Sequence, residues 1–102
     1  MTTNLTKMGM GMMTRTTKRL DGLRREIDRV DRMLVRLLNR RASGAVKIGV
    51  EKKRQHSPIQ DPVRERKILA RVGRLNRGPL SPQAMAKVFS EIISVCRNLQ
   101  QK

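Results

Sequence analysis

The sequence predicts an all-α fold: a chain of three helices, with one long N-terminal helix, that pairs with a second copy of itself. Apolar residues recur at steps of three and four over residues 18–53, where no proline intervenes. Further along the chain, an Asp and a Ser that are each followed by proline (Asp61-Pro62 and Ser81-Pro82) mark the starts of two shorter helices. The 102 residues include one Phe, no Trp and no Tyr, so the core that one chain could build is thin.

The chain begins with a segment that lacks helical periodicity. Thr, Gly and Met dominate residues 1–17, which also carry two basic residues and no acidic one. Such a composition is typical of a disordered terminus. We therefore predict a basic, Met-rich tail over residues 1–17 and a single helical domain over residues 18–102.

The first predicted helix is too long for a compact monomer of this size. About 35 residues at a rise of ~1.5 Å each span roughly 50 Å. Its apolar positions include Leu20, Leu23, Ile27, Val30, Leu34, Leu37, Leu38, Ala45 and Ile48. A helix of this kind is best covered by packing on a second chain.

The second and third helices have clear boundary signals. After a polar loop over residues 54–60, Asp61-Pro62 supplies a favoured N-cap and first helical residue. We expect the second helix to end at Gly78-Pro79, and Ser81-Pro82 repeats the start signal for the third.

Net charge and composition limit the classes of binding partner that the sequence favours. The net charge is +16, and twenty basic against eight acidic residues in 20–102 place it on the folded part. This favours an anionic partner. The absence of aromatic residues among the cations argues against nucleic acid, and a small anionic molecule is the better explanation. No metal-ligand cluster or Gly-rich phosphate loop is present, so we expect no metal or cofactor.

Cellular context follows from cysteine usage and hydropathy. Cys96 is alone, which fits a reducing compartment. No stretch of eighteen apolar residues is present, and the N-terminus lacks a continuous apolar run. We expect a cytoplasmic protein with no membrane partner.

One stripe on the first helix indicates a binding site. Arg41, Ala45, Ile48 and Lys52 follow the spacing i, i+4, i+7, i+11 and so share one face. The two cations lie about 16 Å apart along the axis. Their long side chains can converge on a small, anionic and partly apolar molecule above Ala45, which predicts a site for a small carboxylate.

The stripe belongs to an ordered set of residues on all three predicted helices. The set comprises Arg24, Arg41, Lys52, Asp61-x-x-Arg64-Glu65 and Ile93-x-x-Cys96-x-x-x-Gln100. Over residues 20–101 the chain resembles the all-helical (type II) chorismate mutases. The resemblance implies an intertwined homodimer that rearranges chorismate to prephenate, toward Phe and Tyr, without a metal or cofactor.

The resemblance also implies a role for each residue. Arg41 and the Arg24 of the partner chain would bind the two substrate carboxylates, whose geometry suits guanidinium forks. Lys52 and Gln100 would donate to the ether oxygen of chorismate. Glu65 would accept from the ring hydroxyl, helped by the backbone near Asp61.

The distance between Arg24 and Arg41 along the first helix agrees with a site to which a second chain contributes Arg24. Arg24 and Arg41 are separated by about 25 Å along one helix, so one chain could not easily bring both to one small molecule. Supply of Arg24 by a partner removes this difficulty.

The remaining matched positions complete the expected site. Arg64 corresponds to a further basic residue of the family, and Ile48 and Ile93 would form apolar walls. Cys96 stands where many family members have Ser; because a thiol is a weak donor, we interpret it as a small pocket wall. Arg97 follows, where an apolar residue is common.

Three other functions stay open on the sequence. A lyase of the same fold removes pyruvate from isochorismate and shares the arginines and the lysine, although Asp61-x-x-Arg64-Glu65 looks more like the mutases. A binding module would work with a separate enzyme of the pathway. A basic helical nucleic-acid binder would show steeply salt-dependent affinity.

Overall fold

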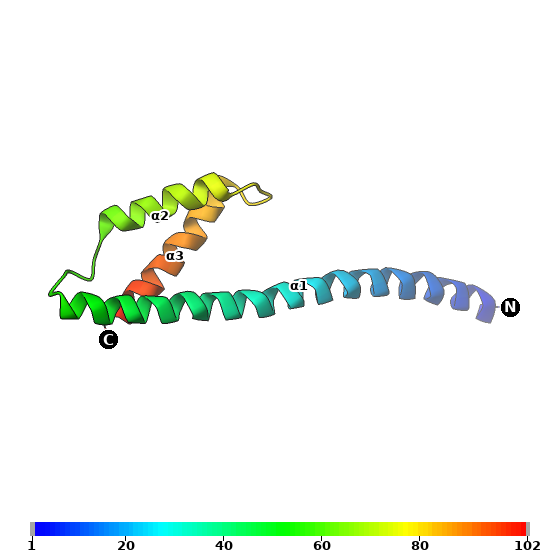
Figure 1. Ribbon diagram of the computed structural model, residues 1–102. Helices are drawn as coiled ribbons and strands as arrows, with labels where there is room; N and C mark the ends of the chain where they lie inside the picture. The colour runs from blue at the N-terminus through cyan, green and yellow to red at the C-terminus, as the bar shows by residue number, and fades with distance from the viewer. Residues whose placement is uncertain (1, 102) are drawn as a thin grey trace. The chain divides into compact units, whose positions relative to one another are not determined.

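The protein consists of three helices in the part that its structure describes. The computed structural model describes residues 2–101, and it describes the side chains of residue 15 and residues 17–101. The helices are α1 (Thr2–Arg54), α2 (Pro62–Leu75) and α3 (Pro82–Gln100), and no strand lies in residues 2–101 (Figure 1). The predicted all-α class is confirmed.

Helix α1 begins earlier than the sequence predicts. Its backbone is helical from Thr2, whereas the periodic pattern places the start near residue 18. No proline lies in residues 1–17, so no residue there lacks the N–H that continues the helical hydrogen bonds. The side chains of residues 1–14 and 16 lie outside the described part, and the domain boundary after residue 17 stays a prediction.

Helix α1 ends in a turn in which residues just after the helix donate hydrogen bonds to carbonyls of its last turn. The N–H of Ser57 donates to the Lys52 carbonyl at 2.8 Å, and that of His56 to the Lys53 carbonyl at 3.2 Å. These two bonds form a Schellman motif, which places its turning residue in the left-handed region. His56 occupies that position with φ 55°.

The starts of α2 and α3 match their predicted caps. The Asp61 carboxylate accepts from the N–H of Arg64 at 3.1 Å, and the Ser81 hydroxyl from the N–H of Ala84 at 3.0 Å. Each cap satisfies one N–H that has no partner inside its helix.

The predicted end of α2 at Gly78-Pro79 is a few residues too late. The helix ends at Leu75, and Asn76 is its C-cap. The Asn76 side chain accepts from the N–H of Gly78 and donates to the Leu80 carbonyl, both at 3.0 Å. This local bonding competes with the helix before the Gly-Pro signal is reached.

The chain divides into two compact units after Leu37. The second unit contains the last part of α1 with α2 and α3, and α2 and α3 pack against each other. Its buried residues include Ala45, Ile68, Ile93 and Cys96. Across the described residues, no helix is both long enough and apolar enough to pass through a membrane.

Candidate functional site

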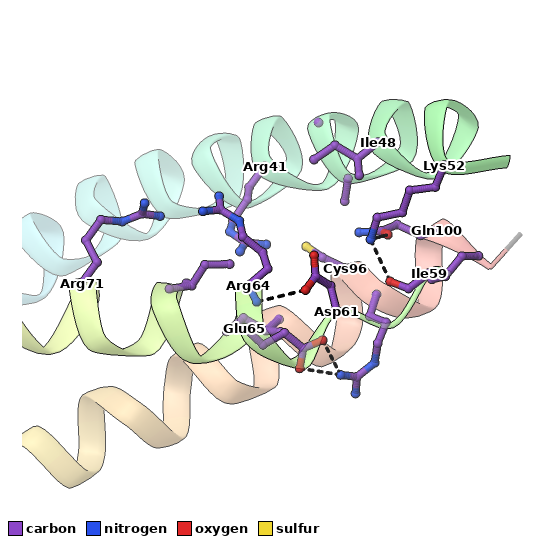
Figure 2. A pocket seen from close by; sticks show the side chains of 15 residues that line it. Arg41, Ile48, Lys52, Ile59, Asp61, Arg64, Glu65, Arg71, Cys96 and Gln100 are labelled. Atoms are coloured by element: carbon purple, nitrogen blue, oxygen red, sulfur yellow. Dashed lines mark hydrogen bonds and ion pairs between the residues drawn. The ribbon is translucent and has the colours of Figure 1, made fainter. Parts of the chain in front are cut away.

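The second unit contains a cavity of about 490 Å³. Residues of α1, α2, α3 and the loop between α1 and α2 line it (Figure 2). Nine of the ten predicted site residues are among them. These are Arg41, Ile48, Lys52, Asp61, Arg64, Glu65, Ile93, Cys96 and Gln100.

The α1 stripe lies along the cavity as its spacing predicts. Arg41, Ala45, Ile48 and Lys52 all line it. Ala45 is buried and leaves room above the helix, because its methyl group is the smallest side chain after glycine. Arg41 and Lys52 therefore stand at the ends of a small apolar floor.

Lys52 is held at one end of the cavity by two acceptors. Its Nζ donates to the backbone carbonyl of Ile59 at 2.8 Å and to Oε1 of Gln100 at 3.2 Å (Figure 2). An ammonium has three N–H donors, so one remains. Because the ammonium only donates, the Gln100 amide oxygen must face it, and the Gln100 NH₂ group remains available to donate.

Gly49 allows Gln100 to come close to α1. A Cβ on Gly49 would lie 2.9 Å from Cα and 3.0 Å from the carbonyl oxygen of Gln100. No side chain fits at such distances from backbone atoms. The absence of a side chain at Gly49 thus sets the separation at which Gln100 reaches Lys52.

Asp61 and Arg64 line the cavity at the start of α2. The Asp61 carboxylate is used as the N-cap of α2, because it accepts from the backbone N–H of Arg64. This bond fixes the beginning of the helix that carries Arg64 and Glu65. The carboxylate also lies near the positive end of the helix dipole, which stabilises its charge.

Glu65 has a partner that the sequence did not predict. Nη1 of Arg97 donates to both carboxylate oxygens of Glu65, each at 2.8 Å, and both residues line the cavity. The side chains of Arg97 and Glu65 are 28% and 26% exposed, so water screens the pair only in part. Glu65 is therefore oriented by α3 although it belongs to α2.

The apolar part of the cavity wall comes from all three helices. Ile68, Ile93 and Cys96 are each less than 10% exposed, whereas Ile48 keeps 51% of its surface exposed. Ile93 and Cys96 are three residues apart on α3 and share a face. The free thiol of Cys96 lies in this wall, as interpreted from the sequence.

Arg24 is the one predicted site residue outside the cavity lining. It belongs to the first unit and is exposed. Five lining residues were missed by the sequence prediction of the site: Gly44, Ile59, Ile68, Arg71 and Arg97. The spacing of Arg64, Ile68 and Arg71, i, i+4, i+7, repeats the pattern of the α1 stripe and could have indicated two of them.

The charges that line the cavity suit an anionic molecule with apolar parts. Five basic residues line it, namely Arg41, Lys52, Arg64, Arg71 and Arg97, against the acidic Asp61 and Glu65. Guanidinium groups form paired hydrogen bonds with carboxylates. Within the described residues, no group of three or more His, Cys, Asp or Glu is placed to hold a metal ion.

Fold and site together define a helical domain with a cavity whose basic and apolar lining suits a small anionic molecule. The family model described as "Chorismate mutase type II" matches residues 23–101. The chain therefore belongs to the type II chorismate mutase family, as its resemblance implied.

Two comparisons agree with this assignment. The structure of chorismate mutase (Form II) from Thermus thermophilus superimposes with a TM-score of 0.81 at 34% identity, covering 82% of this chain and 96% of that one. Form I from the same organism gives a TM-score of 0.75 at 36% identity, covering 76% and 98%.

The curated relatives are longer proteins. A bifunctional chorismate mutase/prephenate dehydratase of Aquifex aeolicus is 45% identical over 87 residues, which are 81% of this chain and 24% of that protein. A protein of the same description from Neisseria gonorrhoeae is 40% identical over 73 residues, 72% of this chain and 20% of that one. The chain thus spans about a quarter or less of these relatives.

Proposed function

We propose that this protein is a chorismate mutase that rearranges chorismate to prephenate in the biosynthesis of Phe and Tyr. The observation that carries the proposal is the pair of donors at one end of the cavity. Lys52 and Gln100 are bonded to each other and each keeps a donor for a third atom. Membership of the type II family supplies the reaction that needs such donors.

The two donors act on the bond that breaks. The C–O bond of the ether breaks as a C–C bond forms between the enolpyruvyl arm and the ring, and negative charge develops on the ether oxygen. The remaining N–H of Lys52 and the NH₂ group of Gln100 stabilise this charge. Because the Ile59 carbonyl and Gln100 already fix the ammonium, little reorganisation is needed in the transition state.

The carboxylates are bound at the other end of the α1 stripe. Arg41 binds one carboxylate of chorismate from within the chain. Arg24 of a second copy binds the other, so that two chains complete each site. Arg64 adds positive charge beside them.

The remaining residues shape and orient the substrate. Glu65 accepts from the ring hydroxyl, together with the backbone near Asp61. Ile48 and Ile93 contact the ring and the enolpyruvyl arm, and Cys96 is a small wall. Their restraint holds the flexible arm over the ring, which a unimolecular, concerted rearrangement requires. No covalent intermediate is involved.

A homodimer is supported by the apolar face of the first unit. Leu23, Ile27 and Leu34 are each about half exposed, and they lie on a face that the described part of this chain leaves open. Burying a side chain of this size contributes about 1.5–3 kcal/mol. A second copy that covers this face would also bring its own Arg24 to the site.

Two further proposals concern context. The relatives that join a mutase to a prephenate dehydratase support cooperation with a separate enzyme of the same pathway. The lone Cys96, which suits a reducing compartment, supports a cytoplasmic location.

The proposal is tested by following the loss of chorismate absorbance with the purified protein. We expect turnover that falls at least about a hundredfold in Arg41→Ala and in Lys52→Ala, because each removes a charge-stabilising contact. The exposed neighbours Arg40→Ala and Lys53→Ala are the matched controls and should keep wild-type rates. Pyruvate release from isochorismate with no turnover of chorismate would instead show the lyase.

A further inference from the structure

The ion pair between Arg97 and Glu65 is unusual in its geometry. One guanidinium nitrogen, Nη1, donates to both carboxylate oxygens at 2.8 Å. The pair of Arg54 with Glu51 has a separation of 3.7 Å, and its side chains are 74% and 58% exposed. The Arg97 pair is thus shorter and much better shielded from water, which makes it the stronger contact.

The contact fixes the direction of the Glu65 carboxylate without blocking it. Because both oxygens are bonded to one atom on α3, the carboxylate cannot rotate without losing a bond. An ionised carboxylate has about four acceptor positions, so about two stay available. Glu65 is thereby held in one orientation at the cavity wall, as its two dashed contacts in Figure 2 show. The remaining acceptor positions leave it able to accept a hydrogen bond from a bound molecule.

The contact also cancels a charge that would oppose the substrate. Chorismate is a dianion, and an isolated carboxylate in the cavity wall would repel it. Since the pair is only about one quarter exposed, water does little to weaken that repulsion. Arg97 offsets the charge of Glu65 at hydrogen-bonding distance and leaves the other cavity cations for the substrate.

We propose that Arg97 is a positioning residue that acts through Glu65, holding the carboxylate in place and neutralising it so that the site accepts a dianion. This inference rests on the proposed mutase function. It assigns Arg97 no contact with the substrate. The effect of Arg97 should therefore exist only while residue 65 is a carboxylate.

A double-mutant cycle on steady-state kinetics tests this dependence. In Arg97→Met the Glu65 carboxylate loses both hydrogen bonds and the positive charge that offsets it. We therefore expect KM for chorismate to rise at least about tenfold while kcat changes less. In Glu65→Gln the amide is neutral, so adding Arg97→Met should change KM less than about threefold. Arg54→Met, which removes the exposed pair, is the matched control and should leave KM unchanged.

Arg97→Lys keeps the inference testable if Arg97→Met fails to fold. A single nitrogen makes both contacts, so an ammonium can replace it as the donor, although the lysine side chain is one atom shorter. We expect this variant to keep KM within about threefold of wild type. A tenfold rise in KM in Arg97→Lys that is equally large when residue 65 is changed to Gln overturns the proposal.

The outcomes separate the inference from the function on which it rests. An equal rise in KM with and without the Glu65 carboxylate overturns the inference, as does a lower melting temperature with unchanged KM, which indicates a purely structural pair. In both cases the wild-type protein still turns over chorismate, and the mutase function stands. A wild-type protein that leaves chorismate unchanged overturns both.

Discussion

The two stretches of α1 on either side of Leu37 carry the same helical periodicity but differ in whether the chain itself buries any of their residues. In the first, the repeating residues are large, and between 44% and 59% of each is exposed: Leu20, Leu23, Ile27, Val30, Leu34 and Leu37. In the second, the buried positions are Ala45 and Gly49.

The size of the buried residues follows from what covers them. Where the chain's own α3 approaches α1, small residues permit close contact of the backbones, as at Gly49 and Gln100. Where no part of the described chain buries the face, the residues are large enough to form half of an interface. The second stretch therefore builds the cavity, and the first is suited to pack on a second chain.

The largest effect on dimerisation and turnover is expected when charged residues are introduced into the first stretch of α1. Ile27 and Leu34 are seven residues apart, so Ile27→Asp with Leu34→Asp puts two charges on one face. We expect the dimer to dissociate and kcat/KM to fall at least about a hundredfold, because each site loses the Arg24 of its partner. Light scattering after gel filtration, with turnover on the same fractions, measures both.

Leu75→Asp is the control for this experiment. Leu75 is 71% exposed at the end of α2 and lies outside the cavity lining, so its charge should change neither mass nor turnover. A charged first stretch that keeps the mass of a dimer would contradict the assignment of this face to a second copy.

An intermediate effect is expected at the close contact of the second stretch. Gly49→Ala forces Gln100 away from α1, and overpacking of this kind costs about 1–3 kcal/mol of unfolding free energy. Because Gln100 then loses its alignment with Lys52, kcat should fall at least about tenfold. Chemical denaturation and steady-state kinetics are the two measurements.

Gly73→Ala is the matched substitution in α2. Nothing lies within 4 Å of a Cβ at Gly73, so the helix should gain up to about 1 kcal/mol from the better helix former. Equal stability changes at Gly49 and Gly73 would show that the approach of Gln100 imposes no constraint.

The smallest effect is expected where the second stretch ends. His56 has φ 55°, a conformation that costs a non-glycine residue about 1–2 kcal/mol. His56→Gly removes this cost but increases the conformational entropy of the unfolded chain. We therefore expect a net gain of about 0.5–1 kcal/mol in unfolding free energy. Gln55→Gly, one residue earlier and without a positive φ, should give no gain; a gain there would refute the explanation.

The elements and most cavity residues could be predicted because their signals are local. Asp61-Pro62 and Ser81-Pro82 define helix starts through contacts within three residues. The stripe from Arg41 to Lys52 follows from helical spacing alone. The end of α2 was misplaced because the Asn76 side chain bonds two loop backbone groups, and such competition is not visible in residue type.

The missed features depend on contacts between distant segments. Arg97 meets Glu65 across 32 residues, and in the sequence nothing distinguishes it from the other basic residues among the 24 of the chain. The backbone carbonyl of Ile59 accepts a hydrogen bond from Lys52. The apolar side chain of Ile59 gives no indication of this contact in the sequence. The role of Arg24 depends on a second chain, so it stays a prediction from the family resemblance and the spacing.

Complementation between two inactive variants tests the two-chain site most directly. Arg24→Ala and Arg41→Ala are co-expressed with different tags, and the mixed dimer is purified through both. Each mixed dimer has one site with Arg41 intact and Arg24 supplied by its partner, so the account predicts about half of the wild-type activity per dimer, although each variant alone is nearly inactive. If Arg24 served the site of its own chain, every site would lack one arginine. A mixed dimer no more active than either variant alone would contradict the account.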